Sequence, residues 1–176
     1  MTYTEDALVE QPAINLFSEL NWDTVTCWDE IFGSLDDANL ADNPLFFGRE
    51  TRNDVVLFAR LKAALLKLNP DVSKLIIQEA IDEIARDRSA MTPIAANEEV
   101  YGLLTNGYVY ITNAEDEDDC VVRYVDWSSA CNNDFLLCSQ MSISGEIETR
   151  RPDLIGFVNG LPIVFIELKA SHKNLL

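Results

Sequence analysis

Residues that bind zinc or form disulfide frameworks are scarce in this chain. The only histidine is His172, and the four cysteines show no Cys-x-x-Cys spacing. Structural zinc sites use closely spaced cysteine and histidine pairs, so a zinc site is not expected. The amino terminus, MTYTEDALVE, is acidic and matches no targeting signal. We therefore expect reduced thiols and a cytoplasmic protein.

Long apolar runs and phosphate-binding loops are also absent. No apolar stretch is long enough to cross a membrane, so no membrane partner is expected. The pattern Gly-x-x-x-x-Gly-Lys-Ser/Thr, whose backbone N–H groups cradle nucleotide phosphates, does not occur. This absence excludes ATP hydrolysis by that route.

Positive charge is scarce: 13 Lys and Arg residues face 30 Asp and Glu residues, which gives a formal net charge of −17. Nucleic-acid binding normally shows as a basic surface, so composition alone argues against a free-standing DNA-binding protein. The 176 residues are 48% hydrophobic and 24% charged, which indicates an ordered globular protein. We expect one domain over residues 1–176.

Helical spacing of apolar residues predicts helices in the first half of the chain. One helix is expected over residues 8–20, with Pro12 in its first turn or at a kink. Asn53 is predicted to cap a second helix, which the Asn69-Pro70 pair ends. Ser73 is predicted to cap a third, whose apolar face would contain Ile77, Ala80, Ile81 and Ile84.

Strands are predicted mainly in the second half of the chain. Residues 21–52 are expected to be irregular, with short strands around residues 24–32. The acidic run Glu115–Asp119 is predicted to be a solvated loop. Alternating or continuous apolar patterns predict strands over residues 106–112, 120–127, 135–148, 154–158 and 161–168. Helices followed by a sheet indicate an α/β fold.

The last two predicted strands end in charged residues. Glu167 and Lys169 are two residues apart on one strand, so their side chains share a face. Pro152-Asp153 opens the preceding strand. Two carboxylates on adjacent strands can bind Mg²⁺, and a neighbouring ammonium can stabilise negative charge that develops on a phosphate. Asp153 and Glu167 are therefore candidate metal ligands in phosphodiester hydrolysis, with Lys169 as the charge stabiliser.

The register of this hairpin decides whether the two carboxylates can meet. A plain two-residue turn at Asn159-Gly160 would place Asp153 opposite Ile166 and facing away from Glu167. A three-residue loop would place Asp153 diagonal to Glu167, at about 7–8 Å between Cα atoms. A nuclease site therefore requires an odd-length loop or a bulge. The alternative is an ordinary strand end, because Glu-x-Lys is short and occurs often by chance.

At these residues the chain resembles a known family. The segment NNDFLLCSQMSISGEIETRRPDLIGFVNGLPIVFIELKASHKNLL closely resembles the amino-terminal nuclease region of the R (restriction) subunit of type I restriction-modification enzymes. RRPD, FVNGLP and IELK occur in the family's order and spacing, and LVEQPAINLFSELNW and LLTNG also resemble it. The resemblance covers most of the chain and is far more specific than Glu-x-Lys alone.

The resemblance implies a PD-(D/E)xK nuclease fold, which is a mixed β-sheet flanked by helices, and Mg²⁺-dependent cleavage of double-stranded DNA. It also implies a longer subunit, in which an ATP-driven translocase follows the nuclease and separate subunits supply methylation and target specificity. This chain would then be the front part of that subunit, and DNA binding could depend on the rest of the complex. The family's Gln-x-x-x-Tyr element would begin about where the chain stops.

Three further residues are candidates for the same site. The resemblance suggests that Glu10 supplies a helix carboxylate to the metal site, although a first-turn Glu is also favoured by the helix dipole alone. Arg150 and Arg151 could contact the DNA backbone or form salt bridges with the many acids.

The alternative function is a non-catalytic docking module that keeps the nuclease scaffold and binds partner subunits.

Overall fold

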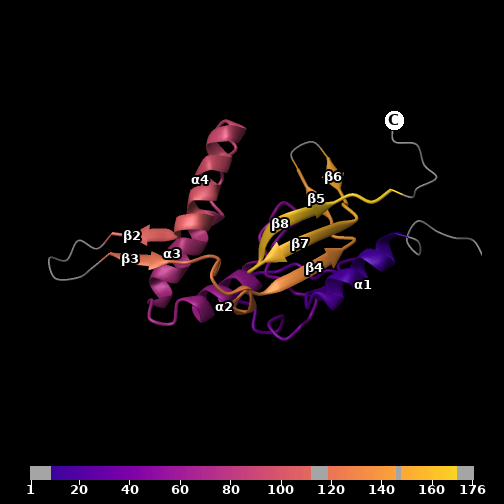
Figure 1. Cartoon of the computed structure of the whole chain (residues 1–176), viewed down its shortest axis with the longest axis horizontal. Helices are drawn as coiled ribbons and strands as arrows, with labels where there is room; N and C mark the ends of the chain where they lie inside the picture. Colours follow the sequence, from indigo (N-terminus) through magenta and orange to yellow (C-terminus); the bar gives the residue numbers. More distant parts are fainter. Residues whose placement is uncertain (1–8, 112–118, 146–147, 170–176) are drawn as a thin grey trace, which may run out of the picture.

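The computed structural model describes residues 9–111, 119–145 and 148–169. A four-stranded sheet lies at its centre, in the order β1-β4-β7-β8 (Figure 1). Strand β1 pairs in parallel with β4, and the other two pairings are antiparallel, so the sheet is mixed. The strands are β1 (Asp23–Thr26), β4 (Phe135–Ser139), β7 (Leu154–Val158) and β8 (Leu161–Ile166). The predicted α/β class with a mixed sheet and helices is confirmed.

Helices pack around this sheet in two groups. Helix α1 (Gln11–Glu19) lies beside β1, and Phe17 from α1 stacks edge-on against Trp22 at 5.1 Å between ring centroids. Pro12 lies in the first turn of this helix, as predicted. Helices α2 (Phe58–Leu68) and α3 (Lys74–Ile84) pack against each other. Their buried side chains form one apolar cluster with the turn end of the β7–β8 hairpin.

The prediction for α3 is confirmed in detail. The Ser73 hydroxyl accepts a hydrogen bond from the backbone N–H of Ile76 at 3.3 Å, which is N-capping. The expected apolar face is buried, with Ile77, Ala80, Ile81 and Ile84 at 7% exposure or less. Local spacing and one capping residue were sufficient here, because the helix is amphipathic over its whole length.

The predicted start of α2 at Asn53 is wrong. The helix begins only at Phe58, after Leu57, whose φ of −88° and ψ of 83° are not helical. The Asp54 carboxylate instead accepts the backbone N–H groups of Glu50 and Thr51, at 2.9 and 2.8 Å, and so forms a turn. The Leu57 N–H donates to the Gly160 carbonyl at 2.9 Å. Because this backbone is used to bind the hairpin turn, it cannot join the helix.

The strand predictions need two corrections. Residues 135–148 do not form one strand, because Gln140 adopts a positive φ of 57° and β4 ends before it. A second short hairpin follows, formed by β5 (Ile143–Ser144) and β6 (Thr149–Arg150). The order of helices before sheet is also wrong, since β1 precedes α2 and joins the central sheet.

Strands β2 (Tyr108–Tyr110) and β3 (Cys120–Val122) form a separate two-stranded sheet beyond helix α4 (Pro93–Asn106). This small sheet contacts α3, and α4 projects away from the body of the molecule (Figure 1). A short 3-10 helix, η2 (Ala130–Asn132), leads into β4. Most of the predicted acidic loop, residues 115–118, lies outside the described residues.

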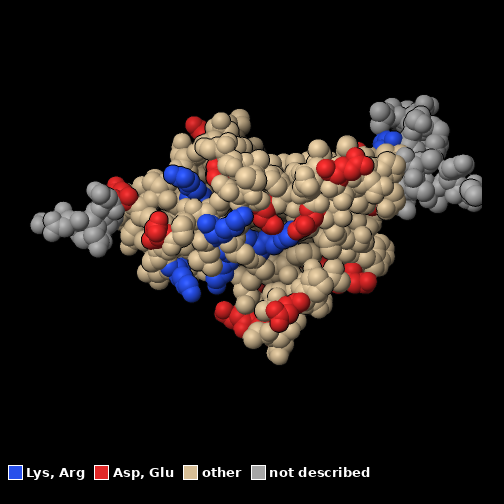
Figure 2. All heavy atoms as spheres, turned by 60° about the horizontal axis from the view of Figure 1, so that its bottom comes forward, with Lys and Arg blue, Asp and Glu red and all other residues tan. Residues whose placement is uncertain are grey.

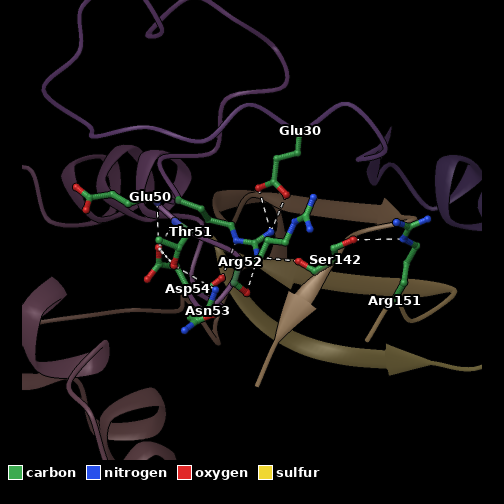
Figure 3. Close-up of polar contacts among 9 residues, drawn as sticks. Glu30, Glu50, Thr51, Arg52, Asn53, Asp54, Ser142 and Arg151 are labelled. Carbon is green, nitrogen blue, oxygen red and sulfur yellow. Dashed lines mark hydrogen bonds and ion pairs between the residues drawn. The ribbon is translucent and has the colours of Figure 1, made fainter. Parts of the chain in front are cut away.

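A buried arginine organises the long segment between β1 and α2. Arg49 is fully buried and donates to both Glu30 carboxylate oxygens, at 3.0 and 2.7 Å. It also donates to the main-chain carbonyls of Asp54, Arg52 and Ser142 (Figure 3). The carbonyl of Ser142 belongs to the segment between β4 and β5. Arg49 therefore connects the irregular segment between β1 and α2 to the end of the central sheet at which β4 ends.

We predict that Arg49→Met lowers the free energy of unfolding by about 3–5 kcal/mol. The substitution leaves the Glu30 carboxylate buried without its cation, and three main-chain carbonyls lose a donor. Chemical denaturation of the variant measures the change.

Arg52→Met is the matched control, because Arg52 is exposed, its guanidinium lies over the Phe32 ring at 5.9 Å, and it acts on Glu30 through its charge without a hydrogen bond or ion pair to that carboxylate. Its expected effect is within about 0.5 kcal/mol of zero. Equal effects of the two substitutions would contradict the central role of Arg49.

Candidate functional site

The β7–β8 hairpin closes through a tight turn at Asn159 and Gly160. Both residues have positive φ, 51° and 78°, and Val158 pairs directly with Leu161. This geometry belongs to the two-residue turns that suit the twist of a hairpin, and Asn-Gly is their preferred sequence. A Cβ on Gly160 would lie 2.6 Å from the backbone of Leu57 and Leu61, so glycine also allows the turn to pack against α2.

A β-bulge then changes the register of the hairpin. Phe157 pairs with Pro162, but Gly156 pairs with Val164, so Ile163 is the extra residue of β8. The far end of the hairpin therefore pairs Leu154 with Ile166. Continued by one residue, this register sets Asp153 opposite Glu167. The predicted bulge is present, and the predicted three-residue loop is not.

Asp153 contacts the backbone that follows β8. Its Oδ2 accepts a hydrogen bond from the Leu168 N–H at 2.5 Å, which joins the two strand ends that carry the motif. Asp153 is half-buried, whereas Glu167 and Lys169 are exposed on either side of half-buried Leu168. In the motif, the Asp153 carboxylate is therefore fixed by a hydrogen bond, and the charged groups of Glu167 and Lys169 are exposed to solvent.

Glu10 approaches the same end of the sheet through Gln140. The Gln140 amide donates to the Glu10 carboxylate at 3.1 and 3.4 Å. Ser139 pairs with Leu154, so Gln140 follows β4 at the level where Asp153 precedes β7. The left-handed backbone of Gln140, with φ of 57°, ends β4 at this level. Glu10, Asp153 and Glu167 are therefore all at one end of the sheet.

The two candidate DNA-contacting arginines already have partners. Arg150 forms an ion pair with Glu148, and its Nε donates to that carboxylate at 2.8 Å. Hydrogen bonding to Glu148, and then the charge of Glu167, raise the pKa of Arg150 above its usual value. The guanidinium of Arg151 lies over the Trp28 ring at 4.2 Å, and its Nε donates to the Ser142 hydroxyl at 3.2 Å (Figure 3).

The donor set suits a hard divalent cation only in part. Within residues 9–111, 119–145 and 148–169 no group of three or more His, Cys, Asp or Glu side chains is close enough to hold a metal ion. Asp153 and Glu167 supply two carboxylates, and Glu10 stays bound to Gln140. Mg²⁺ commonly binds through one or two carboxylates, with water and substrate phosphate as its other ligands, so two carboxylates fit this cation.

Sequence reasoning did not identify Gln140, Trp28 or the N–H of Leu168 as parts of this site. Gln140 is the residue whose position could have been inferred, because it interrupts an apolar strand opposite the Pro-Asp motif. Trp28 comes from an irregular segment, and no local pattern relates it to Arg151. His172 follows the motif but lies outside the described residues.

An α/β domain with an acidic pair and a lysine at the end of a hairpin is the kind of scaffold found in metal-dependent nucleases. Comparison with known proteins identifies the family. The model for the type I restriction enzyme R protein N terminus matches residues 2–176. The chain belongs to this family, as its motifs indicated.

Two curated relatives agree with this assignment. The chain is 34% identical over 137 residues to the type I restriction enzyme HindI endonuclease subunit of Haemophilus influenzae, an alignment that covers 73% of this chain and 12% of that protein. It is 27% identical over 139 residues to a candidate type I MjaIXP endonuclease subunit of Methanocaldococcus jannaschii, covering 74% and 13%. The chain therefore spans about one eighth of the length of these relatives.

We predict that Glu10 and Gln140 are energetically coupled. Gln140→Gly removes the amide and leaves a residue that tolerates the positive φ, so the backbone should persist. A double-mutant cycle of Glu10→Ala and Gln140→Gly should give an interaction energy of about 0.5–1 kcal/mol in denaturation experiments.

The control cycle replaces Glu19 with Ala in place of Glu10, because Glu19 is an exposed acid at the other end of the same helix. That cycle should be additive. Additivity in both cycles would show that the contact between Glu10 and Gln140 does not hold α1 to the sheet in solution.

Proposed function

We propose that this chain is the Mg²⁺-dependent nuclease domain of a type I restriction enzyme R subunit, with a PD-(D/E)xK fold, and that it cleaves double-stranded DNA. The observation that carries the proposal is the bulge at Ile163, after which Leu154 pairs with Ile166, the residues next to Asp153 and Glu167. Lys169 is two residues beyond Glu167 on the same segment. The names of the two relatives, both endonuclease subunits, support the same function.

Each residue of the motif has a separate task in this proposal. Asp153 and Glu167 would hold Mg²⁺, which when bound polarises a phosphoryl oxygen and lowers the pKa of a bound water. The N–H of Leu168 fixes the orientation of the Asp153 carboxylate. Lys169, exposed beside Glu167, would stabilise negative charge on the phosphate as the bond to the leaving oxygen breaks.

Glu10 and the two arginines would act around this centre. Gln140 holds the Glu10 carboxylate at the same end of the sheet, from which it could bind a metal-bound water. Arg151, positioned by Trp28 and Ser142, could contact a DNA phosphate near the cleaved bond. Arg150 would have to exchange Glu148 for phosphate, which makes its contribution to DNA binding smaller.

The remaining steps of restriction would depend on parts of the complex beyond this chain. ATP binding and translocation would belong to the remainder of the R subunit, and methylation and target specificity to separate subunits. None of the helices among the described residues has the length and apolarity needed to cross a membrane. The alternative, a non-catalytic docking module, has no observation of its own in its favour and is tested below.

We predict that replacing Asp153, Glu167 or Lys169 with Ala in the complete restriction complex abolishes DNA cleavage and leaves ATP-driven translocation intact. Loss of either acid removes a metal ligand, and loss of Lys169 should lower turnover more than DNA binding. Cleavage of plasmid DNA and a translocation assay measure the two activities separately.

Glu148→Ala is the matched control, since Glu148 is an exposed acid close to the motif, and among the described residues its carboxylate pairs with Arg150 and with no residue of the motif. It should cleave at nearly the normal rate. Without Mg²⁺, Glu167→Ala should unfold at the same temperature as the parent protein or higher, because it removes one exposed negative charge from an acidic chain, whereas Asp153→Ala also loses the hydrogen bond from the Leu168 N–H. Normal cleavage by the triple-Ala complex would disprove the nuclease assignment and favour the docking module.

A further inference from the structure

The few cations of this acidic chain are unevenly distributed. Residues 55–70 contain Arg60, Lys62 and Lys67 but no Asp or Glu, although the whole chain has 30 acids. Lys74 follows at the start of α3. Figure 2 shows several Lys and Arg side chains gathered on one face, with acidic side chains beside some of them. Over residues 55–74 four cations are present with one acid, Asp71, which lies in the turn between α2 and α3.

Four exposed cations surround the turn between α2 and α3. Lys62 and Lys67 belong to α2, and Lys74 begins α3. Arg123 is brought beside them by Asn69, whose side-chain amide bonds to the Arg123 N–H and carbonyl, at 2.9 and 3.0 Å. We call these four residues, Lys62, Lys67, Lys74 and Arg123, the basic surface.

The basic surface lacks ion pairs, as do Arg52, Arg151 and Lys169 among the described residues, whereas the remaining described cations have them. Arg49, Arg60, Arg86, Arg88 and Arg150 all form ion pairs with acids. Within the described part of the chain, none of the four residues of the basic surface forms such a pair. Lys67 donates to the main-chain carbonyl of Asn132 at 3.0 Å. Its charge also acts on the Asp134 carboxylate, and that of Arg123 acts on Asp126, but neither pair is a salt bridge. These charges are available to an external anion.

The position of the basic surface suits an extended anion. Gly160, in the hairpin turn, lies against the backbone of Leu57 and Leu61, so α2 is at the opposite end of the hairpin from Asp153. Five residues of β7 separate the two ends, or about 17 Å at the rise of a strand. One turn of duplex DNA is about 34 Å long, so a duplex bound at the site could reach α2.

We propose that the basic surface binds the phosphate backbone of duplex DNA at a distance from the cleavage site. The proposal rests on the proposed function, which makes DNA the substrate. At physiological ionic strength charges are screened beyond about 8 Å, so a local cluster can attract phosphate despite the net charge of −17. The contact carries no sequence information and would position the duplex along the hairpin.

The test measures binding of the 176-residue chain to a 30-base-pair fluorescent duplex by anisotropy, in EDTA and at several salt concentrations. Lys62→Gln/Lys74→Gln removes two cations that make no hydrogen bond or ion pair with the described residues. The slope of log K against log salt should become less steep by about 2, since each phosphate contact contributes about 0.9. Affinity at low salt should fall about tenfold or more.

The control is Ala90→Asp/Asn97→Asp, which makes the same change in net charge. Both positions are exposed and lie beyond the far end of α3 from the basic surface. The control should keep the parent slope. Equal effects of the two variants would overturn the proposal, because they would show that only net charge matters.

Binding in EDTA also separates this proposal from the nuclease assignment. No cleavage is possible without metal, so the salt dependence in EDTA reports on DNA binding alone. One outcome is that DNA binding depends on Lys62 and Lys74 while the complex with Asp153, Glu167 and Lys169 all replaced by Ala still cleaves. That result would support the basic surface and contradict the catalytic assignment. If cleavage requires Asp153 but the slope of log K against log salt is unchanged when both lysines are replaced, the catalytic assignment is supported and the proposed basic surface is wrong.

Discussion

The hydrogen bonds of the buried Asn159 side chain are the interactions on which the site depends most. Its amide donates to the Tyr124 carbonyl at 2.7 Å and to the Asn133 side chain at 2.8 Å, and its oxygen accepts the Asp134 N–H at 2.7 Å. Asn159 is fully buried, so each unmade bond would leave a desolvated polar group. These bonds hold the hairpin turn against the segments that precede β4, and β7 and β8 extend from that turn.

The site at the other end of the hairpin results from two departures from regular structure. The bulge at Ile163 brings Glu167 level with Asp153, and the positive φ of Gln140 ends β4 beside them. A regular hairpin on the same turn would have set Asp153 opposite Ile166. Arg49 stabilises the surrounding segment by bonding to the Ser142 carbonyl, two residues after Gln140. Irregular backbone and buried polar bonds thus bring the charged groups together.

Positive and negative side chains are unevenly distributed over this molecule. A net charge of −17 seemed to argue against DNA as a partner, but ion pairs with acids occupy much of the positive charge in the described chain. Among the described cations without an ion pair, four lie around the turn between α2 and α3, and Arg151 stacks on Trp28 near the motif. Phosphate would meet these local groups, because distant charges are screened by salt.

The sequence by itself determined the features that depend on neighbouring residues. The Ser73 cap, the apolar face of α3 and the Asn-Gly turn follow from local spacing, and the family follows from the motifs. Only the tertiary structure decided where α2 begins, where β8 bulges and which residue holds Glu10. Leu57 stays outside the helix because the carbonyl of Gly160, about a hundred residues later, accepts its N–H. A local pattern contains no information about such a distant partner.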